Sequence, residues 1–316
     1  MDWLNDYYEE TDKFPRLNWD GVYKHVDENY KHYEDEKLDE LWTNIARYWM
    51  SNIINKLNDN YGIHESNNFI LVTSEDENYV CNTLGYLERT LKRILSSLEG
   101  IASDEGFGKH ILIIFDDIDA YYSYLSHYYS EDGEYALSSG VYLNNGYGHF
   151  AFPHQELNFA ESITAHEMTH ALLSHLKIPA WLNEGIAVTI ENLLTGSFPF
   201  RMDDETYMRH KSYWIEEEIQ KFWSGDIFHE AGEGNELGYY LAQFAVHSLS
   251  KDYEAFKEFV NNAEFRDGGE EAANKVYGVS LGELIQQYFG EGDWSPAPEK
   301  WETRQVDKPN LTPMIL

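Results

Sequence analysis

The sequence predicts an α+β fold in which a mixed sheet is followed by a helical half. Short apolar runs at 69–72 and 111–115 are typical of buried strands. The pair Asn145-Gly146 stands between two further apolar segments and indicates a β-hairpin. After Asn158, almost the whole sequence has the hydrophobic spacing of helices.

The first expected element is a helix at 41–57, within an acidic and aromatic region that extends to residue 66. Its apolar residues recur at helical spacing: Leu41, Ile45, Tyr48, Trp49, Ile53 and Leu57. Residues 1–66 could pack on the rest of the chain or cover a cleft as a regulatory segment. We expect packing, because so many aromatic side chains require burial.

A second expected helix follows the strand at 69–72. It has one apolar stripe and ends at Gly100; the stripe comprises Leu84, Leu87, Leu91, Ile94, Leu95 and Leu98. The strand at 111–115 comes next. The hairpin strands at 139–143 and 148–152 then precede the helix that begins near Asn158, where Asn158 and Glu161 resemble an N-terminal cap.

Composition excludes several functional classes. The chain has 316 residues, of which 42% are hydrophobic and 16% aromatic, as expected for a folded protein. A formal charge of −33 argues against a nucleic-acid partner, because phosphates would be repelled. A single cysteine, Cys81, excludes an internal disulfide and a cysteine-rich zinc site.

The N-terminal residues Met1–Asp6 contain neither a basic nor an apolar leader, and no segment is apolar over eighteen residues. We therefore expect a soluble, cytoplasmic protein without a membrane partner. No pattern points to an oligomeric state.

The residues with the clearest chemistry are His166-Glu167-Met168-Thr169-His170. Two histidines four residues apart lie on one face of a helix, so both imidazoles can bind one metal ion. Glu167 lies one step around the helix and can accept a proton from a water molecule at the metal. The same two histidines could also be an ordinary core or surface pair. A third ligand at a suitable distance would distinguish a metal site from such a pair.

Glu184 is that third candidate. Pro179 breaks the first helix, and a second helix begins near Ala180 and carries Glu184 in its early turns. Two helices joined by a short loop can bring a carboxylate near the start of the second to the end of the first. Two histidines, one glutamate and one open position form a typical catalytic zinc set.

The segment Trp181-Leu182-Asn183-Glu184-Gly185-Ile186-Ala187 resembles the corresponding segment of gluzincin metallopeptidases, closest to the M1 aminopeptidase clan and the smaller peptidase MA-like domains. The resemblance implies a zincin-like fold, with a mixed, mostly antiparallel sheet packed with the active-site helix. It also implies one Zn²⁺ ion bound by His166, His170 and Glu184. The short interval between His170 and Glu184 is most similar to the MA-like domains.

The resemblance extends downstream. Tyr239 through Leu249 is similar to a helix on which the M1 enzymes carry a tyrosine that stabilises the oxyanion; the family spacing favours Tyr239 over Tyr240. The stretch 279–294 resembles the end of MA-like domains. We therefore divide the chain into an N-terminal, mainly helical region 1–66, a catalytic domain 67–294 and a tail 295–316. The catalytic domain comprises the sheet and zinc helix (67–177) and the helical half (178–294).

The sequence also departs from the family. M1 aminopeptidases hold the substrate amine with a glutamate before the zinc helix, but residues 146–152 contain no acidic residue. We expect 148–152 to be an exposed edge strand that could pair with an extended peptide. Val188 stands where thermolysin-like enzymes have an aspartate that supports a ligand histidine, and Glu191 is a candidate replacement.

The sequence therefore predicts a zinc-dependent metallopeptidase whose partner is a peptide or protein substrate. Two alternatives remain. The site could hydrolyse a non-peptide amide or ester, because the metal chemistry is shared. The chain could also be a zinc-bound protein that binds peptides without cleaving them, although the presence of the base Glu167 argues against this alternative.

Overall fold

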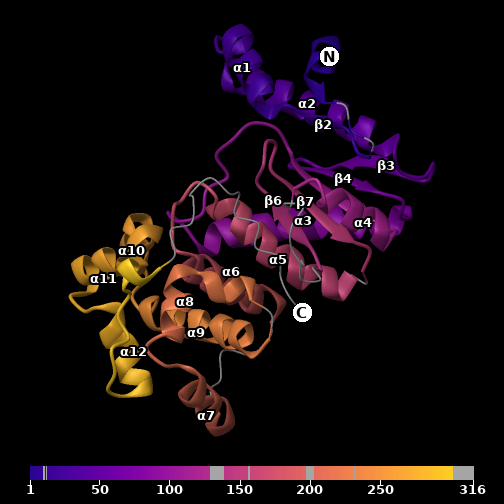
Figure 1. The fold of residues 1–316 in the computed structure, drawn as a ribbon. Helices are drawn as coiled ribbons and strands as arrows, with labels where there is room; N and C mark the ends of the chain where they lie inside the picture. Colours follow the sequence, from indigo (N-terminus) through magenta and orange to yellow (C-terminus); the bar gives the residue numbers. More distant parts are fainter. Residues whose placement is uncertain are drawn as a thin grey trace. The chain divides into compact units, whose positions relative to one another are not determined.

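The computed structural model describes residues 1–9, 11, 13–128, 139–155, 157–196, 203–230 and 232–301. These residues form two compact units, which we describe separately. Unit 1 comprises residues 1–92 and 104–164, and unit 2 comprises residues 93–103 and 165–301. Both units contain helices, and unit 1 also contains the sheets (Figure 1).

The main sheet of unit 1 has five strands in the order β3-β4-β5-β7-β6. The strands are β3 (Gly62–Glu65), β4 (Phe69–Thr73), β5 (His110–Phe115), β7 (His149–Pro153) and β6 (Val141–Leu143). The predicted strands at 69–72 and 111–115 are confirmed as β4 and β5. The strand β3 was not expected. Its four residues include Gly62 and two polar side chains, so they lack the apolar run from which a buried strand is predicted.

The sheet is mixed, as expected, but the prediction that it is mostly antiparallel is wrong. The outer pairs β3/β4 and β6/β7 are antiparallel, whereas β4/β5 and β5/β7 are parallel. The parallel pairs depend on the length of the connections, because two parallel neighbouring strands must be joined by a long crossover segment. The helix α3 (Glu77–Ser97) provides that crossover between β4 and β5.

The hairpin is confirmed, but its second strand lies inside the sheet. β6 and β7 pair antiparallel, with Val141 opposite Ala151 and Leu143 opposite His149. β7 also pairs with β5 along its other side, so the expectation that residues 148–152 form an exposed edge strand is wrong. Its residues 149–152 are all buried, as is typical of a strand covered on both faces. The edge strands are β3 and β6.

Residues 1–66 pack on one face of this sheet, as their aromatic content predicts. The helices α1 (Trp19–Tyr30) and α2 (Asp35–Ile54) share one hydrophobic core with β4, β5 and α4 (Ile118–Leu125). Trp49 of α2 is fully buried in this core, edge-on to Trp19. A short 3-10 helix at Asp2–Tyr7 and a small sheet of β1 (Tyr8–Glu9) and β2 (Arg16–Leu17) complete the region.

His149 is a fully buried polar residue that contacts Trp49 of this core. Its Nδ1 donates to the Tyr147 carbonyl oxygen at 2.8 Å, so its Nε2 is left to accept a hydrogen bond from the Tyr124 hydroxyl at 2.7 Å. Burial lowers the pKa of His149 to about 4, although the bond to Tyr147 acts in the opposite direction. The imidazole is therefore neutral in the folded protein at neutral pH.

This neutral histidine makes unit 1 sensitive to acid. An imidazole in the unfolded chain has a pKa of about 6.5, so the unfolded state gains a proton first as the pH falls, and stability is lost between about pH 6.5 and pH 4. We expect the free energy of unfolding to fall by about 2 kcal/mol more between pH 7 and pH 5 than in the variant His149→Gln. Urea unfolding of both proteins at the two pH values measures the difference; equal losses would contradict the prediction.

Unit 2 is helical, as predicted for residues 178–294, and its described residues contain no strand. The helix α5 (Leu157–Leu173) enters it, and seven helices follow: α6 (Ala180–Thr195), α7 (Asp204–Tyr213), α8 (Glu218–Ser224), α9 (Glu233–Leu249), α10 (Tyr253–Asn262), α11 (Glu270–Tyr277) and α12 (Leu281–Phe289). Trp181 and Trp223 are buried at its centre with their rings 5.5 Å apart. The indole of Trp181 donates to the Gly268 carbonyl oxygen at 2.9 Å.

The predicted tail at 295–316 is only partly described. Residues 295–301 contact Gln220 of α8, which donates to the Ser295 carbonyl oxygen and accepts from the Ala297 amide. Residues 302–316 lie outside the described residues.

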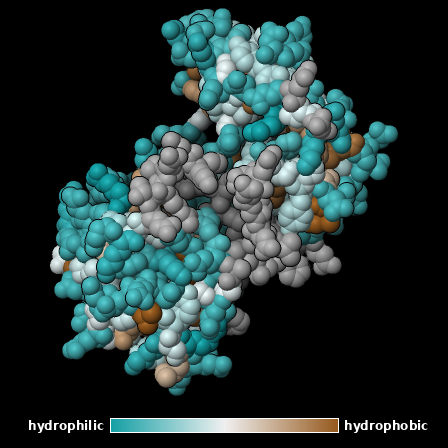
Figure 2. Space-filling view, viewed as in Figure 1, coloured by the Kyte–Doolittle hydropathy of each residue, from teal (hydrophilic) through white to brown (hydrophobic). Residues whose placement is uncertain are grey.

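The described surface is mostly polar on the face drawn in Figure 2. In Figure 2 the hydrophilic colour covers most of it, and the apolar colour is confined to small separate areas. No helix among the described residues combines the length and the apolar character needed to cross a bilayer.

Candidate metal centre

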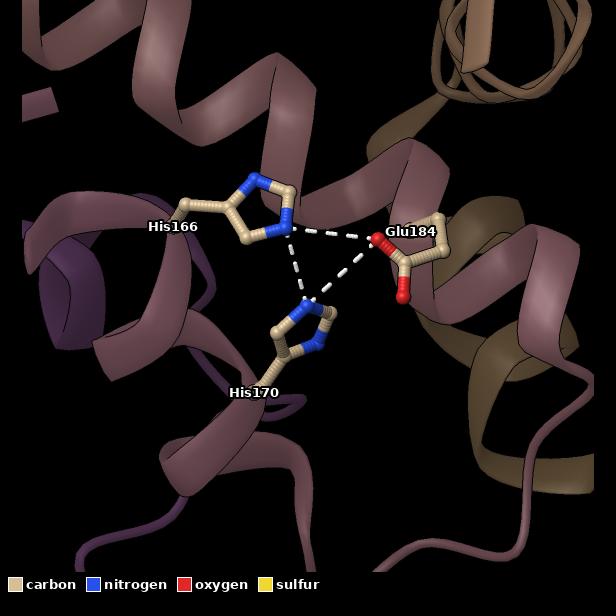
Figure 3. A group of neighbouring side chains, drawn as sticks. All are labelled: His166, His170 and Glu184. Carbon is tan, nitrogen blue, oxygen red and sulfur yellow. Dashed lines mark hydrogen bonds and ion pairs between the residues drawn. The ribbon is translucent and has the colours of Figure 1, made fainter. Parts of the chain in front are cut away.

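The centre is built on two consecutive helices, and its residues belong to unit 2. α5 carries His166 and His170, and α6 carries Glu184 (Figure 3). Glu167 is also on α5. α5 begins at Leu157, so the predicted cap Asn158 lies inside it, and the Asn158 side chain is outside the described part of the structure. α5 ends at Leu173, and α6 begins directly after Pro179, as the sequence predicts.

The three predicted ligands converge on one point. His166 Nε2 lies 3.0 Å from His170 Nε2 and 3.3 Å from Glu184 Oε2, and His170 Nε2 lies 3.5 Å from the same oxygen. Ligand atoms about 2.0–2.1 Å from a tetrahedral zinc ion are about 3.3 Å apart. The three side chains therefore form one triangular face of a coordination tetrahedron, and among the described residues they are the group that could hold a metal ion.

The burial of Glu184 supports a metal at this point. The side chain is 1% exposed, and its carboxylate faces the imidazoles of His166 and His170. A buried carboxylate is costly unless a cation balances it. Glu184 has no Lys or Arg partner in the described part of the chain; its only ion-pair neighbours are His166 and His170.

The pKa values show the same balance of charge. Burial disfavours the charged form of His166, but Glu184 and then Glu191 outweigh it and raise the pKa of His166 to about 10. Burial likewise opposes the charge of Glu184, yet the two imidazoles hold its pKa well below the usual range. A metal ion at this point would therefore compete with protons for the imidazole nitrogens.

Glu191 supports His166 from the other side. Its Oε2 lies 3.2 Å from His166 Nδ1, and both residues are in unit 2, on α6 and α5. A carboxylate at Nδ1 fixes the proton there and leaves Nε2 free to bind a metal. The predicted contact between Glu191 and a ligand histidine is thus present.

Glu167 and Tyr239 both lie at this centre. Glu167 is 1% exposed, and its carboxylate is among the charges that raise the pKa of His166 and of Tyr239. The Tyr239 ring lies 6.4 Å from the His166 ring, and the tyrosine hydroxyl is buried without a hydrogen-bond partner among the described residues. Burial and then the Glu184 carboxylate raise the pKa of Tyr239 well above its usual value, so the phenol keeps its proton.

Tyr240, the alternative to Tyr239, lies elsewhere. Its ring packs 5.9 Å from the ring of His210, which is on α7. The structure therefore brings Tyr239, and not Tyr240, to the His166 ring.

Gly185 sets the distance between α6 and α9, and this was not foreseen from the sequence. A Cβ atom at this position would lie 2.6 Å from the Ala242 carbonyl oxygen and 2.7 Å from Val246 Cγ2. The absence of a side chain thus allows the helix with Glu184 to approach the helix with Tyr239. A glycine inside a helix is the only sequence signal of such a contact.

Replacing Gly185 by alanine should therefore destabilise unit 2. Alanine favours helices over glycine by about 1 kcal/mol, but the clash with the α9 backbone should exceed this gain, for a net loss of about 1–3 kcal/mol. Urea unfolding measures this loss of unfolding free energy. Gly106→Ala is the control, because a Cβ atom at Gly106 would meet no atom within 4 Å. A Gly185→Ala protein as stable as the wild type would show that the helices separate at no cost.

Three further histidines have other partners. His149 of unit 1 contacts Trp49 and Tyr124, and His154, also in unit 1, forms an ion pair with Glu75 at 2.8 Å. His229 ends the short 3-10 helix η2 (Asp226–His229), and Glu230 pairs with Lys221 at 3.3 Å.

In comparisons with known proteins, no family model and no curated protein matches the chain. A functional assignment therefore depends on the geometry and chemistry of the centre itself.

Proposed function

We propose that this protein is a zinc-dependent metallopeptidase. The observation that carries the proposal is the buried triangle of His166 Nε2, His170 Nε2 and Glu184 Oε2, with separations of 3.0–3.5 Å. Two imidazoles and one carboxylate are the ligand set of catalytic zinc sites that keep a fourth position open. The nitrogen-rich set and the tetrahedral separations favour zinc over magnesium or calcium, which prefer oxygen ligands.

A bound zinc ion would supply a Lewis acid that polarises the scissile carbonyl and lowers the pKa of water. The rest of the chemistry belongs to side chains of this chain. Glu167 accepts the proton of the attacking water and then delivers it to the leaving amine nitrogen. Glu191 keeps the proton of His166 on Nδ1, so that Nε2 faces the metal.

Tyr239 is suited to stabilise the oxyanion. Its hydroxyl is buried, lacks a hydrogen-bond partner among the described residues and keeps its proton. A hydroxyl held in this way can donate a hydrogen bond to the oxyanion that develops in the transition state.

Peptide is favoured as the substrate over other amides by the resemblance of Trp181–Ala187 to gluzincin peptidases. The position of β7 inside the sheet removes 148–152 as a strand to which a peptide could be added, so recognition has to use other groups. The alternatives are a zinc hydrolase for non-peptide amides or esters and a zinc protein that binds peptide without cleaving it.

A proteome-derived peptide library, incubated with the purified zinc-loaded protein, tests the proposal. We expect cleavage that a chelator abolishes and that added zinc restores. Bound but uncleaved peptides would support the non-catalytic alternative. If neither cleavage nor binding of peptides occurs, and small esters or amides are hydrolysed in a chelator-sensitive reaction, the non-peptide alternative would replace the proposal.

A further inference from the structure

The position of Tyr239 depends on how its ring is packed. Its hydroxyl makes no hydrogen bond of good geometry among the described residues, and the polar groups near it include the Glu184 carboxylate, itself a candidate metal ligand. A tyrosine of this kind can rotate about its side-chain bonds unless its neighbours prevent it. What holds the ring therefore decides where the hydroxyl lies.

Phe228 is the aromatic neighbour of Tyr239 that is not part of the metal centre. The two rings meet edge to face, with centroids 5.2 Å apart and planes at 75°. The phenylalanine is 0% exposed, so its own ring has little freedom. Edge-to-face pairs at this distance are favourable and have a defined geometry, which gives the contact directional character.

Phe228 belongs to a turn that is fixed to the same helix as Tyr239. The turn is η2, and its Ile227 carbonyl oxygen accepts a hydrogen bond from Asn235 Nδ2 of α9 at 3.3 Å. Ile227 also fits against a glycine of α9, because a Cβ at Gly238 would lie 2.9 Å from its Cγ2. The turn is therefore seated on α9 one residue from Tyr239, and Phe228 is presented to the tyrosine from a rigid support.

We propose that Phe228 is a positioning residue for Tyr239: it holds the phenol ring against His166, so that the hydroxyl stays at the metal centre without a hydrogen bond of its own. Among the ring contacts of the described residues, none joins Phe228 to His166 or His170, and Phe228 acts through Tyr239 alone. The role in catalysis rests on the proposed function, whereas the control of the tyrosine ring does not.

The kinetic test compares Phe228→Leu with Phe256→Leu, a change at a similarly buried phenylalanine of α10. In the zinc-loaded full chain, Phe228→Leu should lower kcat by about three- to tenfold, leave KM and zinc content unchanged, and have no further effect in a Tyr239→Phe background. Phe256→Leu should leave kcat unchanged. An equal loss with and without the Tyr239 hydroxyl, or the same loss in Phe256→Leu, would overturn the proposal. Phe228→Met, which fills more of the space, replaces Phe228→Leu if the latter does not fold.

A second measurement does not need hydrolysis. In protein labelled with 3-fluorotyrosine, the ¹⁹F signal assigned by its loss in Tyr239→Phe should shift or narrow in Phe228→Leu and stay unchanged in Phe256→Leu. If no peptide is cleaved but this signal responds, the proposed function fails and the positioning role stands. If peptides are cleaved but the signal is the same in Phe228→Leu as in the wild type, the positioning role fails.

Discussion

Replacing Glu167 by glutamine is expected to lower kcat by about 10³-fold or more while one zinc ion per chain is retained. Glutamine has nearly the same size and can still hydrogen-bond, but it cannot accept a proton at neutral pH. The three ligand atoms belong to other side chains, so their separations of 3.0–3.5 Å should persist. The loss would therefore report proton transfer and not the loss of the metal.

Metal analysis and peptide cleavage must be measured on the same preparation. Glu258→Gln is a suitable control, because it removes an exposed carboxylate from α10 of the same unit. Cleavage by Glu167→Gln at more than about a tenth of the wild-type rate would contradict the assigned role of the base. Loss of zinc from this variant would instead show that Glu167 takes part in holding the site together.

The ligand set could be predicted because its signals are local. His166 and His170 lie one turn apart on any helix, and Pro179 fixes where the next helix starts. The position of Glu184 follows once the two helices are joined by a short loop. For the same reason the helical half could be predicted from the helical spacing of its apolar residues, and the buried strands β4 and β5 from short apolar runs.

The features that could not be predicted depend on contacts between residues distant in sequence. The sheet order places β7 between β5 and β6, although its apolar run would serve equally well at an edge. Phe228 meets Tyr239 only because η2 folds back on α9, and nothing in the residues between them indicates this contact. The approach of α6 to α9 at Gly185 likewise needs both helices to be in place.

Glu184 and Glu191 should differ strongly in their effect on zinc binding, although both carboxylates face His166. Glu184 Oε2 is one corner of the ligand triangle, so Glu184→Gln replaces a charged ligand by a weak neutral one. We expect this variant to lose its zinc on dialysis. Glu191 only holds the proton on His166 Nδ1 at 3.2 Å, and its replacement should weaken zinc binding by about 10- to 100-fold.

Thermal unfolding gives an independent measure, because a metal that binds only the folded state stabilises it in proportion to ln(1 + [Zn]/Kd). At a zinc concentration about 1,000 times Kd, the wild type should gain about 4 kcal/mol relative to the chelated protein. Glu191→Gln should gain about 1.4–2.7 kcal/mol less at the same concentration, and Glu184→Gln should show almost no gain. Equal gains in all three proteins would place the metal elsewhere, because only a ligand and its supporting carboxylate produce this graded order.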